Sequence, residues 1–132
     1  MAANTEPIFA LKPITAKCAL SAANTARDGS GTLVTLYESV SASGSKVAQI
    51  WYKAEDVTTA GIIRLFITDD TGANPDLFDE LAVAAVTPSA VVSTAYNSVT
   101  YTDLQLKTGQ ILKATTHNAE AINVFASIGD FE

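Results

Sequence analysis

The stretch GQILKATTHNAEAINVFASIGDFE, residues 109–132, decides the fold class of this chain. Within it, Ile111–Thr116 and Ala121–Ile128 are rich in β-branched and apolar residues, and the polar residues 117–120 separate them. Such runs are typical of β-strands joined by a turn. The last run alternates with a period of two, one face formed by Ile122, Val124, Ala126 and Ile128 and the other by Asn123, Phe125 and Ser127. We therefore expect a β-hairpin whose last strand is buried on one face.

The same pattern continues through the preceding sequence. Short runs rich in β-branched and aromatic residues predict further strands, separated by Gly, Asp, Asn, Ser and Pro, at Cys18–Ala23, Thr32–Tyr37, Lys46–Ala54, Gly61–Thr68, Leu77–Val86 and Ser98–Leu106. About eight strands without crossover helices predict an all-β fold of two packed antiparallel sheets, a jelly-roll sandwich, with an immunoglobulin-like sandwich as the alternative. Residues 77–86 also admit a helix, because Asn74 and Pro75 suit a helix start.

Alternation assigns faces to the two central strands. In Lys46–Ala54, one face is predicted to hold Ala48, Ile50, Tyr52 and Ala54, and the other Gln49, Trp51 and Lys53. In Gly61–Thr68 the outer face is predicted to hold Ile62, Arg64 and Phe66, with the guanidinium group of Arg64 in water. Before these strands, the glycines of the segment Arg27–Gly31 are expected to supply the positive φ angles of a tight connection.

The N-terminal residues differ in composition from the rest. Pro7 and Pro13 flank Ile8, Phe9 and Leu11, which favours an extended segment over a helix or a central strand. We expect residues 1–16 to form an arm that grips a neighbouring subunit and residues 17–132 to form the β-sandwich domain. The alternative is a first edge strand that lies on its own domain.

Composition excludes several classes of protein. The length of 132 residues fits one domain, and the net charge of −6 disfavours binding to nucleic acid. Charged residues make up 17% of the chain, below the roughly one-quarter typical of soluble domains. A single cysteine, Cys18, cannot form an intramolecular disulfide. With no signal peptide and no apolar run of about 18 residues, we expect a protein that is made in a cytoplasm and does not bind or span a membrane.

Catalytic and metal-binding signals are weak. His117 is the sole histidine and lies in the polar segment of the last strand pair, so a triad is possible only through that residue. Cys18 lies in an apolar run and is interpreted as a packing residue. The acidic residues between 69 and 80 offer enough oxygen ligands for calcium, but their composition is also that of ordinary turns. We expect no enzyme activity, no catalytic residues, no metal and no cofactor.

Three segments, taken together, resemble a family of small proteins from the virion structural modules of tailed bacteriophages. They are ANTARDGSGTLVTLYES at 23–39, TTAGIIRLFITDDTG at 58–72 and LKTGQILKATTHNAEAINVFASIGDF at 106–131. The resemblance implies a structural component of a phage particle. The expected function is that of a head decoration, or cement, protein on the capsid exterior, which binds the major capsid protein as a homo-oligomer, a dimer or a trimer. A tail or baseplate protein is the alternative within the same class.

Apolar residues on the arm and on outer strand faces are the expected contacts of such a protein. These interface candidates are Ile8, Phe9, Leu11, Ile62, Phe66 and Phe125. A carbohydrate-binding adhesion module is a further alternative, with Trp51, Tyr52, Tyr96 and Tyr101 as its candidate aromatics. Because Trp51 and Tyr52 are adjacent in one strand, they point to opposite faces and cannot form one platform.

Overall fold

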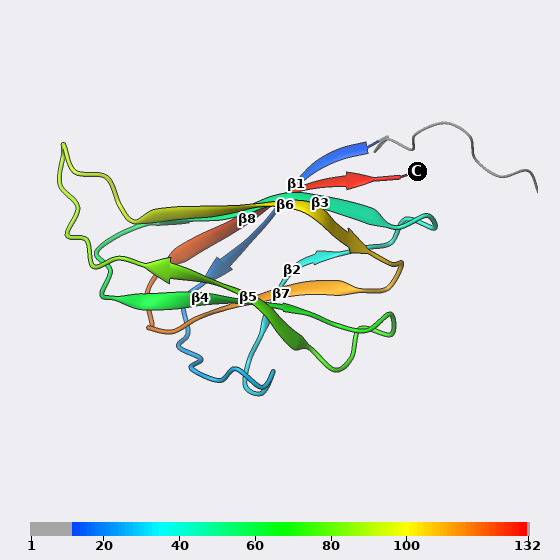
Figure 1. The fold of residues 1–132 in the computed structure, drawn as a ribbon. Coiled ribbons are helices and arrows are strands. Elements are labelled where there is room, and N and C mark those ends of the chain that lie inside the picture. The colour runs from blue at the N-terminus through cyan, green and yellow to red at the C-terminus, as the bar shows by residue number, and fades with distance from the viewer. Residues whose placement is uncertain (1–11, 132) are drawn as a thin grey trace, which may run out of the picture.

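The computed structural model describes residues 12–131. The candidate contacts Ile8, Phe9 and Leu11 lie outside these residues, as does most of the expected arm. The described chain folds into the strands β1 (Lys12–Leu20), β2 (Val34–Glu38), β3 (Ser45–Ala54), β4 (Gly61–Ile67), β5 (Asp76–Val83), β6 (Tyr96–Leu106), β7 (Ile111–Thr116) and β8 (Ile122–Asp130) (Figure 1). Among residues 12–131, no helix is long and apolar enough to cross a membrane.

The strands form two antiparallel sheets of four, in the orders β1-β8-β3-β6 and β2-β7-β4-β5. Each strand pairs with its mirror-image partner in chain order, β1 with β8, β2 with β7, β3 with β6 and β4 with β5. The additional pairs β3–β8 and β4–β7 complete the sheets. This is the pairing of a jelly roll, so the predicted sandwich is confirmed and the immunoglobulin-like order is excluded.

The core lies between the sheets and follows from the two-residue period of the strands. Both central strands of each sheet contribute fully buried apolar side chains, among them Val47, Ile50, Val124, Ile63, Leu65, Leu112 and Ala114. The largest aromatic residue of the core, Tyr52, is 1% exposed, and its hydroxyl donates a hydrogen bond to the carbonyl oxygen of Ala82 at 2.7 Å. The bond satisfies the polar end of a buried ring and links the two sheets.

A polar network joins the two sheets at the end of β3 away from Tyr52. The carboxylate of Asp130, 6% exposed, accepts hydrogen bonds from the hydroxyls of Ser45 at 2.6 Å and Tyr37 at 2.7 Å. The hydroxyl of Ser45 also lies 2.8 Å from that of Ser39. Because Tyr37 is on β2 and Asp130 on β8, the network joins the two sheets, and the bonds offset the cost of burying a carboxylate.

The prediction of a C-terminal hairpin is wrong. β7 pairs with β2 and β4, whereas β8 pairs with β1 and β3, so the connection after Thr116 crosses from one sheet to the other. The backbone N–H of His117 still donates to the carbonyl oxygen of Ile62 on β4 at 3.0 Å. Alternation in the sequence identifies strands but does not identify their partners, since partners here are far apart in the chain.

The first strand begins at Lys12, inside the segment expected to be an arm. Residues 12–16 therefore belong to the sandwich, where β1 is the edge strand beside β8. This finding moves the start of the β-sandwich domain from residue 17 to residue 12. It also places Pro13 on an edge strand, which is the sheet position that tolerates a residue without an N–H donor.

Register shifts occur in both sheets, and one of them alters a predicted face. The β3 pairings with β6 and β8 shift between Val47 and Gln49, so Ala48 is exposed although it was assigned to the face of Ile50. The β4–β5 pairing shifts between Leu65 and Phe66, and Phe78 packs against the core. Each β-bulge adds a residue to one strand and resets the alternation beyond it. Residues 76–83 are nonetheless a strand, which excludes the helical alternative.

The connection between β1 and β2, residues 21–33, lies against the outer side of the second sheet. Gly29 and Gly31 have the expected positive φ angles, 84° and 78°. A Cβ atom on Gly29 would lie 2.4 Å from the carbonyl oxygen of Pro75, so only glycine fits this approach to the start of β5. The connection therefore holds a fixed position over that sheet.

Candidate binding face

The outer side of the β1-β8-β3-β6 sheet carries an aromatic pair. The strand register aligns one row of residues across the sheet, Lys17 on β1, Phe125 on β8, Trp51 on β3 and Ser98 on β6. The rings of Trp51 and Phe125 stack with centroids 5.5 Å apart and planes inclined by 18°. Both side chains are half-buried. We call this side of the molecule the open face and define it by Lys17, Lys46, Trp51, Lys53, Asn123 and Phe125.

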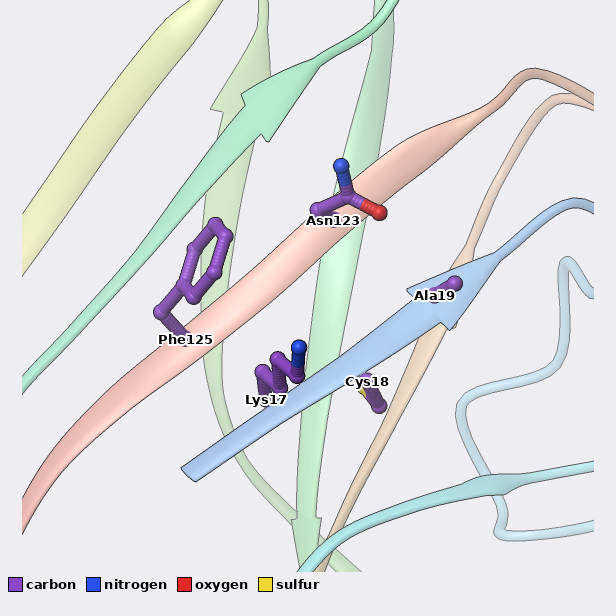
Figure 2. Close-up of a pocket in the computed structure, with 5 residues that line it drawn as sticks. All are labelled: Lys17, Cys18, Ala19, Asn123 and Phe125. Carbon is purple, nitrogen blue, oxygen red and sulfur yellow. The ribbon is translucent and has the colours of Figure 1, made fainter. Parts of the chain in front are cut away.

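A hollow of about 320 Å³ lies beside the aromatic pair. Figure 2 shows Lys17, Asn123 and Phe125 projecting on the same side of β1 and β8, while Cys18 points to the opposite side. The side chain of Asn123 donates to the Glu55 carboxylate at 2.9 Å, which orients its amide. Burial raises the pKa of the Cys18 thiol to about 11, so the thiol stays protonated, in agreement with its interpretation as a packing residue.

A second hollow of similar volume lies further along β1 and β8. It is lined by Pro13, Lys46, Ala48, Ser127, Ile128 and Gly129. The bulge that exposes Ala48 thus helps to shape the open face. Both hollows are at the lower end of the volume range of small-molecule sites, so the face suits contact with an extended surface better than enclosure of a ligand.

The open face carries three lysines, and the Glu55 carboxylate lies beside its Asn123. Lys17, Lys46 and Lys53 project from it, in a protein whose net charge is −6. The amine of Lys53 donates to the carbonyl oxygen of Thr94 at 2.9 Å, whereas Lys17 and Lys46 are exposed. An aromatic pair surrounded by lysines and an amide can supply apolar contact area together with hydrogen-bond donors, and this combination favours an acidic partner.

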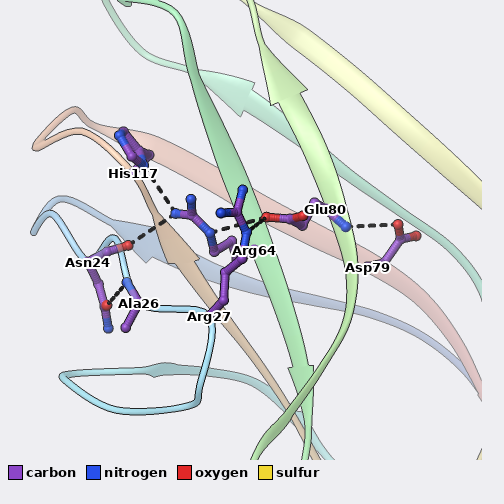
Figure 3. A network of polar contacts seen from close by, with 7 residues as sticks. All are labelled: Asn24, Ala26, Arg27, Arg64, Asp79, Glu80 and His117. Atoms are coloured by element: carbon purple, nitrogen blue, oxygen red, sulfur yellow. Dashed lines mark hydrogen bonds and ion pairs between the residues drawn. The ribbon is translucent and has the colours of Figure 1, made fainter.

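The outer side of the other sheet is covered by the chain itself. Arg64, expected to have its guanidinium in water, is only 2% exposed. Its Nη1 donates to the carbonyl oxygen of Asn24 at 3.4 Å and lies 3.2 Å from Nδ1 of His117, which must act as the acceptor (Figure 3). The connection between β1 and β2 thus closes over this side chain, a long-range contact that alternation along β4 does not reveal.

A carboxylate neutralises the buried guanidinium. Oε2 of Glu80 lies 3.2 Å from Nε of Arg64, and it also accepts a hydrogen bond from Nε of Arg27 at 2.8 Å (Figure 3). The contact with Arg64 is an ion pair without hydrogen-bond geometry. The imidazole of His117 thus contacts the guanidinium group of Arg64, which in turn donates a hydrogen bond to the β1–β2 connection at Asn24.

The acidic connection after β4 is organised by one carboxylate. Asp69 accepts hydrogen bonds from the backbone and hydroxyl of Thr71, from the backbone of Ala73 and from the side chain of Asn74. The bond from the Thr71 hydroxyl is the main cause that lowers the pKa of Asp69 to about 2. The carboxylate oxygens of Asp69 thus already accept hydrogen bonds from donors in the same turn. Residues 12–131 contain no cluster of three or more His, Cys, Asp or Glu side chains arranged to hold a metal ion.

The structure does not bring the predicted contact residues together. Phe125 lies on the open face, whereas Ile62 is on the outer side of the other sheet and is half-buried. Phe66 is fully buried and therefore cannot be a surface contact. Phe125 is therefore the described candidate that remains on the open face.

Sequence reasoning missed the combination that forms the open face. Alternation placed Phe125 outward and put Trp51 and Lys53 on one face of their strand, without assigning that face to the core or to solvent; the structure places it outward. However, the strand partners that align Lys17 with Phe125 and Trp51 could not be read from the period of either strand. An outward aromatic residue on each of two strands was the available signal.

No protein-family model matches the sequence, and no curated protein matches it.

Proposed function

We propose that this protein is a structural component of a tailed-bacteriophage particle, and specifically a head decoration protein on the capsid exterior. In this proposal it binds the shell of the major capsid protein and stabilises it. The jelly roll supports the proposal at the level of fold, since capsid domains commonly use it, although a fold alone does not define a function.

The observation that carries the proposal is the difference between the two outer sides of the sandwich. On one side, residues 21–33 contact Arg64 and Glu80, and the side chains of Arg64 and Phe66 are buried. The other side leaves the Trp51–Phe125 stack half-buried. A decoration protein needs a rigid body with one side available for the shell, and stacked aromatic residues are frequent centres of such contacts.

Charge supports an acidic surface as the partner of the open face. The lysines at 17, 46 and 53 lie on this face, although acidic residues exceed basic ones by 14 to 8 in the whole chain. Complementary charge would orient the protein as it approaches the shell and would place its acidic remainder away from the contact.

Cryo-electron microscopy of the intact particle tests the proposal directly. We expect density for this chain on the outside of the head, with the β1-β8-β3-β6 sheet toward the major capsid protein. Density on a tail fibre or baseplate would replace the decoration assignment by the tail alternative. Absence of the chain from purified particles would overturn both.

A binding assay tests the face itself. Lys17→Glu should weaken binding to particles that lack the protein by roughly tenfold or more, because it places like charges at the contact. Lys107→Glu is the matched control, since Lys107 is exposed on the turn between β6 and β7 and pairs with Asp70. Equal binding by the two variants would contradict a role for the open face.

Deletion of residues 2–11 leaves β1 intact, and undiminished affinity would show that this segment is not a clamp.

A carbohydrate-binding adhesion module is the second candidate. The observation that favours it is the hollow lined by Phe125, Asn123 and Lys17, which combines a ring with polar donors. Binding of a soluble glycan that is lost in Phe125→Ala and retained in Lys107→Glu would support this candidate. If no glycan binds in such a screen and the particle shows density for the chain on the head, the decoration role is supported over the adhesion role.

A further inference from the structure

The four edge strands of the sandwich differ in how well they are protected against pairing with another chain. Three of them carry features that hinder such pairing. β1 contains Lys12, Pro13 and Lys17, β2 has five residues and a register shift, and β5 contains Asp76, Asp79 and Glu80 and a register shift. Charges, prolines, short length and bulges are the usual means by which proteins block an exposed sheet edge.

β6 lacks these features over its first half. No charged residue lies between Glu80 and Asp103, and the strand from Tyr96 to Thr102 contains no proline. Its pairing with β3 is regular from Tyr96 to Thr100 and shifts only beyond Thr100. The segment is thus a regular, uncharged edge at the end of the β1-β8-β3-β6 sheet.

The backbone of this segment has capacity for another strand. Within residues 12–131, Tyr96–Thr102 makes no backbone–backbone hydrogen bond outside the pairing with β3. The N–H of Ser98 donates instead to Oδ1 of the adjacent Asn97 at 2.8 Å. A local side-chain acceptor of this kind can be exchanged for the carbonyl oxygen of a neighbouring strand.

We propose that a second copy of this chain pairs its β6 antiparallel to Tyr96–Thr100, joining two four-stranded sheets into one continuous sheet across a two-fold axis. In a two-fold symmetric dimer, the same surface patch of each chain contacts its copy on the partner. Because each chain has a net charge of −6, contacts between acidic patches would be repulsive. The uncharged edge avoids that repulsion. Tyr96, 57% exposed at the start of the strand, would also become covered.

Sedimentation analysis of the full chain tests this inference, which does not depend on a role in a virion. We expect a dimer whose dissociation constant rises at least roughly tenfold in Thr100→Lys, because a charged residue on the paired edge hinders the addition of a strand. Thr15→Lys is the matched control, since Thr15 is an exposed threonine on the opposite edge of the same sheet. We expect it to leave the dimer unchanged.

Disulfide cross-linking gives an independent readout that does not require a destabilising charge. In a Cys18→Ala background, single cysteines at Tyr96, Ser98 and Thr100 should cross-link two chains only at the position nearest the axis. A protein that stays monomeric, or a dimer that is insensitive to Thr100→Lys and does not cross-link at any of the three positions, would overturn the proposal. A trimer would do the same, because antiparallel β6 pairing joins two copies only.

Discussion

The ring of Trp51 stacks on that of Phe125, 5.5 Å away between centroids, and the two residues face each other across the β3–β8 pairing in the middle of the open face. Stacked aromatic pairs contribute about 0.5–1.5 kcal/mol beyond the area that they bury. We therefore expect a double-mutant cycle of Trp51→Ala and Phe125→Ala, measured by urea unfolding, to give a coupling free energy of about 1 kcal/mol. A coupling energy near zero would show that the rings do not interact in solution.

Two phenylalanines provide a matched comparison of burial. Phe66 is fully buried, whereas Phe125 is half-buried. Phe66→Ala should lower the free energy of unfolding by about 3–5 kcal/mol, because the substitution creates a cavity. In the same urea titration, Phe125→Ala should lower the free energy of unfolding by clearly less. Similar costs would contradict the assignment of Phe66 to the interior and of Phe125 to the surface.

The buried arginine makes Glu80 important for stability. Glu80→Gln removes the charge that neutralises Arg64 and should lower the free energy of unfolding by about 1–3 kcal/mol. The lower part of this range applies if solvent reaches the carboxylate, since the Glu80 side chain is 32% exposed. Glu120→Gln, a carboxylate substitution at an exposed bond to Thr59, is the control and should cost less. Equal losses would argue against the Arg64 network.

Tyr101 should make the protein sensitive to alkaline pH. Burial, and then the hydrogen bond to Asp79 at 2.7 Å, raise the pKa of Tyr101 above its ordinary value of 10. The unfolded chain therefore releases this proton first, so the stability that the protonated phenol contributes is complete below pH 10 and falls as pH rises above it. We expect Tyr101→Phe to show a smaller loss of urea midpoint than the parent protein between neutral pH and about pH 11.

Asp69 should make the stability of the protein sensitive to acidic pH. The hydrogen bonds of its own turn lower its pKa to about 2 from the ordinary value of 3.8. Its contribution to stability is therefore complete above pH 3.8 and is lost as pH falls through 2. Asp69→Ala should reduce the thermal midpoint at neutral pH, whereas Asp70→Ala removes only an exposed ion pair and should have little effect. If the two variants lose stability equally, the turn is not organised by Asp69.

Strand positions could be predicted because alternation is a local property. The last strand was expected at 121–128 and is observed at 122–130, and its inward residues, such as Val124, are buried as expected. The glycines of the β1–β2 connection also have the positive φ that the sequence indicated. These features depend on neighbours in the chain, which the sequence displays directly.

The errors arose where distant segments meet. A bulge shifted Ala48 outward, residues 21–33 contact Arg64, whose guanidinium was expected in water, and Phe66, an expected interface contact, is buried. The strands around His117 entered different sheets although they are separated by a short turn. Each outcome depends on pairing between residues that are far apart in sequence, which periodicity alone does not encode.

The position of β8 between β1 and β3 has a consequence for the order of folding. On the ribosome, the first sheet cannot close until the chain has been synthesised through Asp130, because β1 has no described strand partner other than β8. The pairing of the first strand with the last also gives the domain a high contact order, which slows folding. Nascent chains should therefore remain protease-sensitive until β8 has left the ribosome, and they should then become protected in a single step.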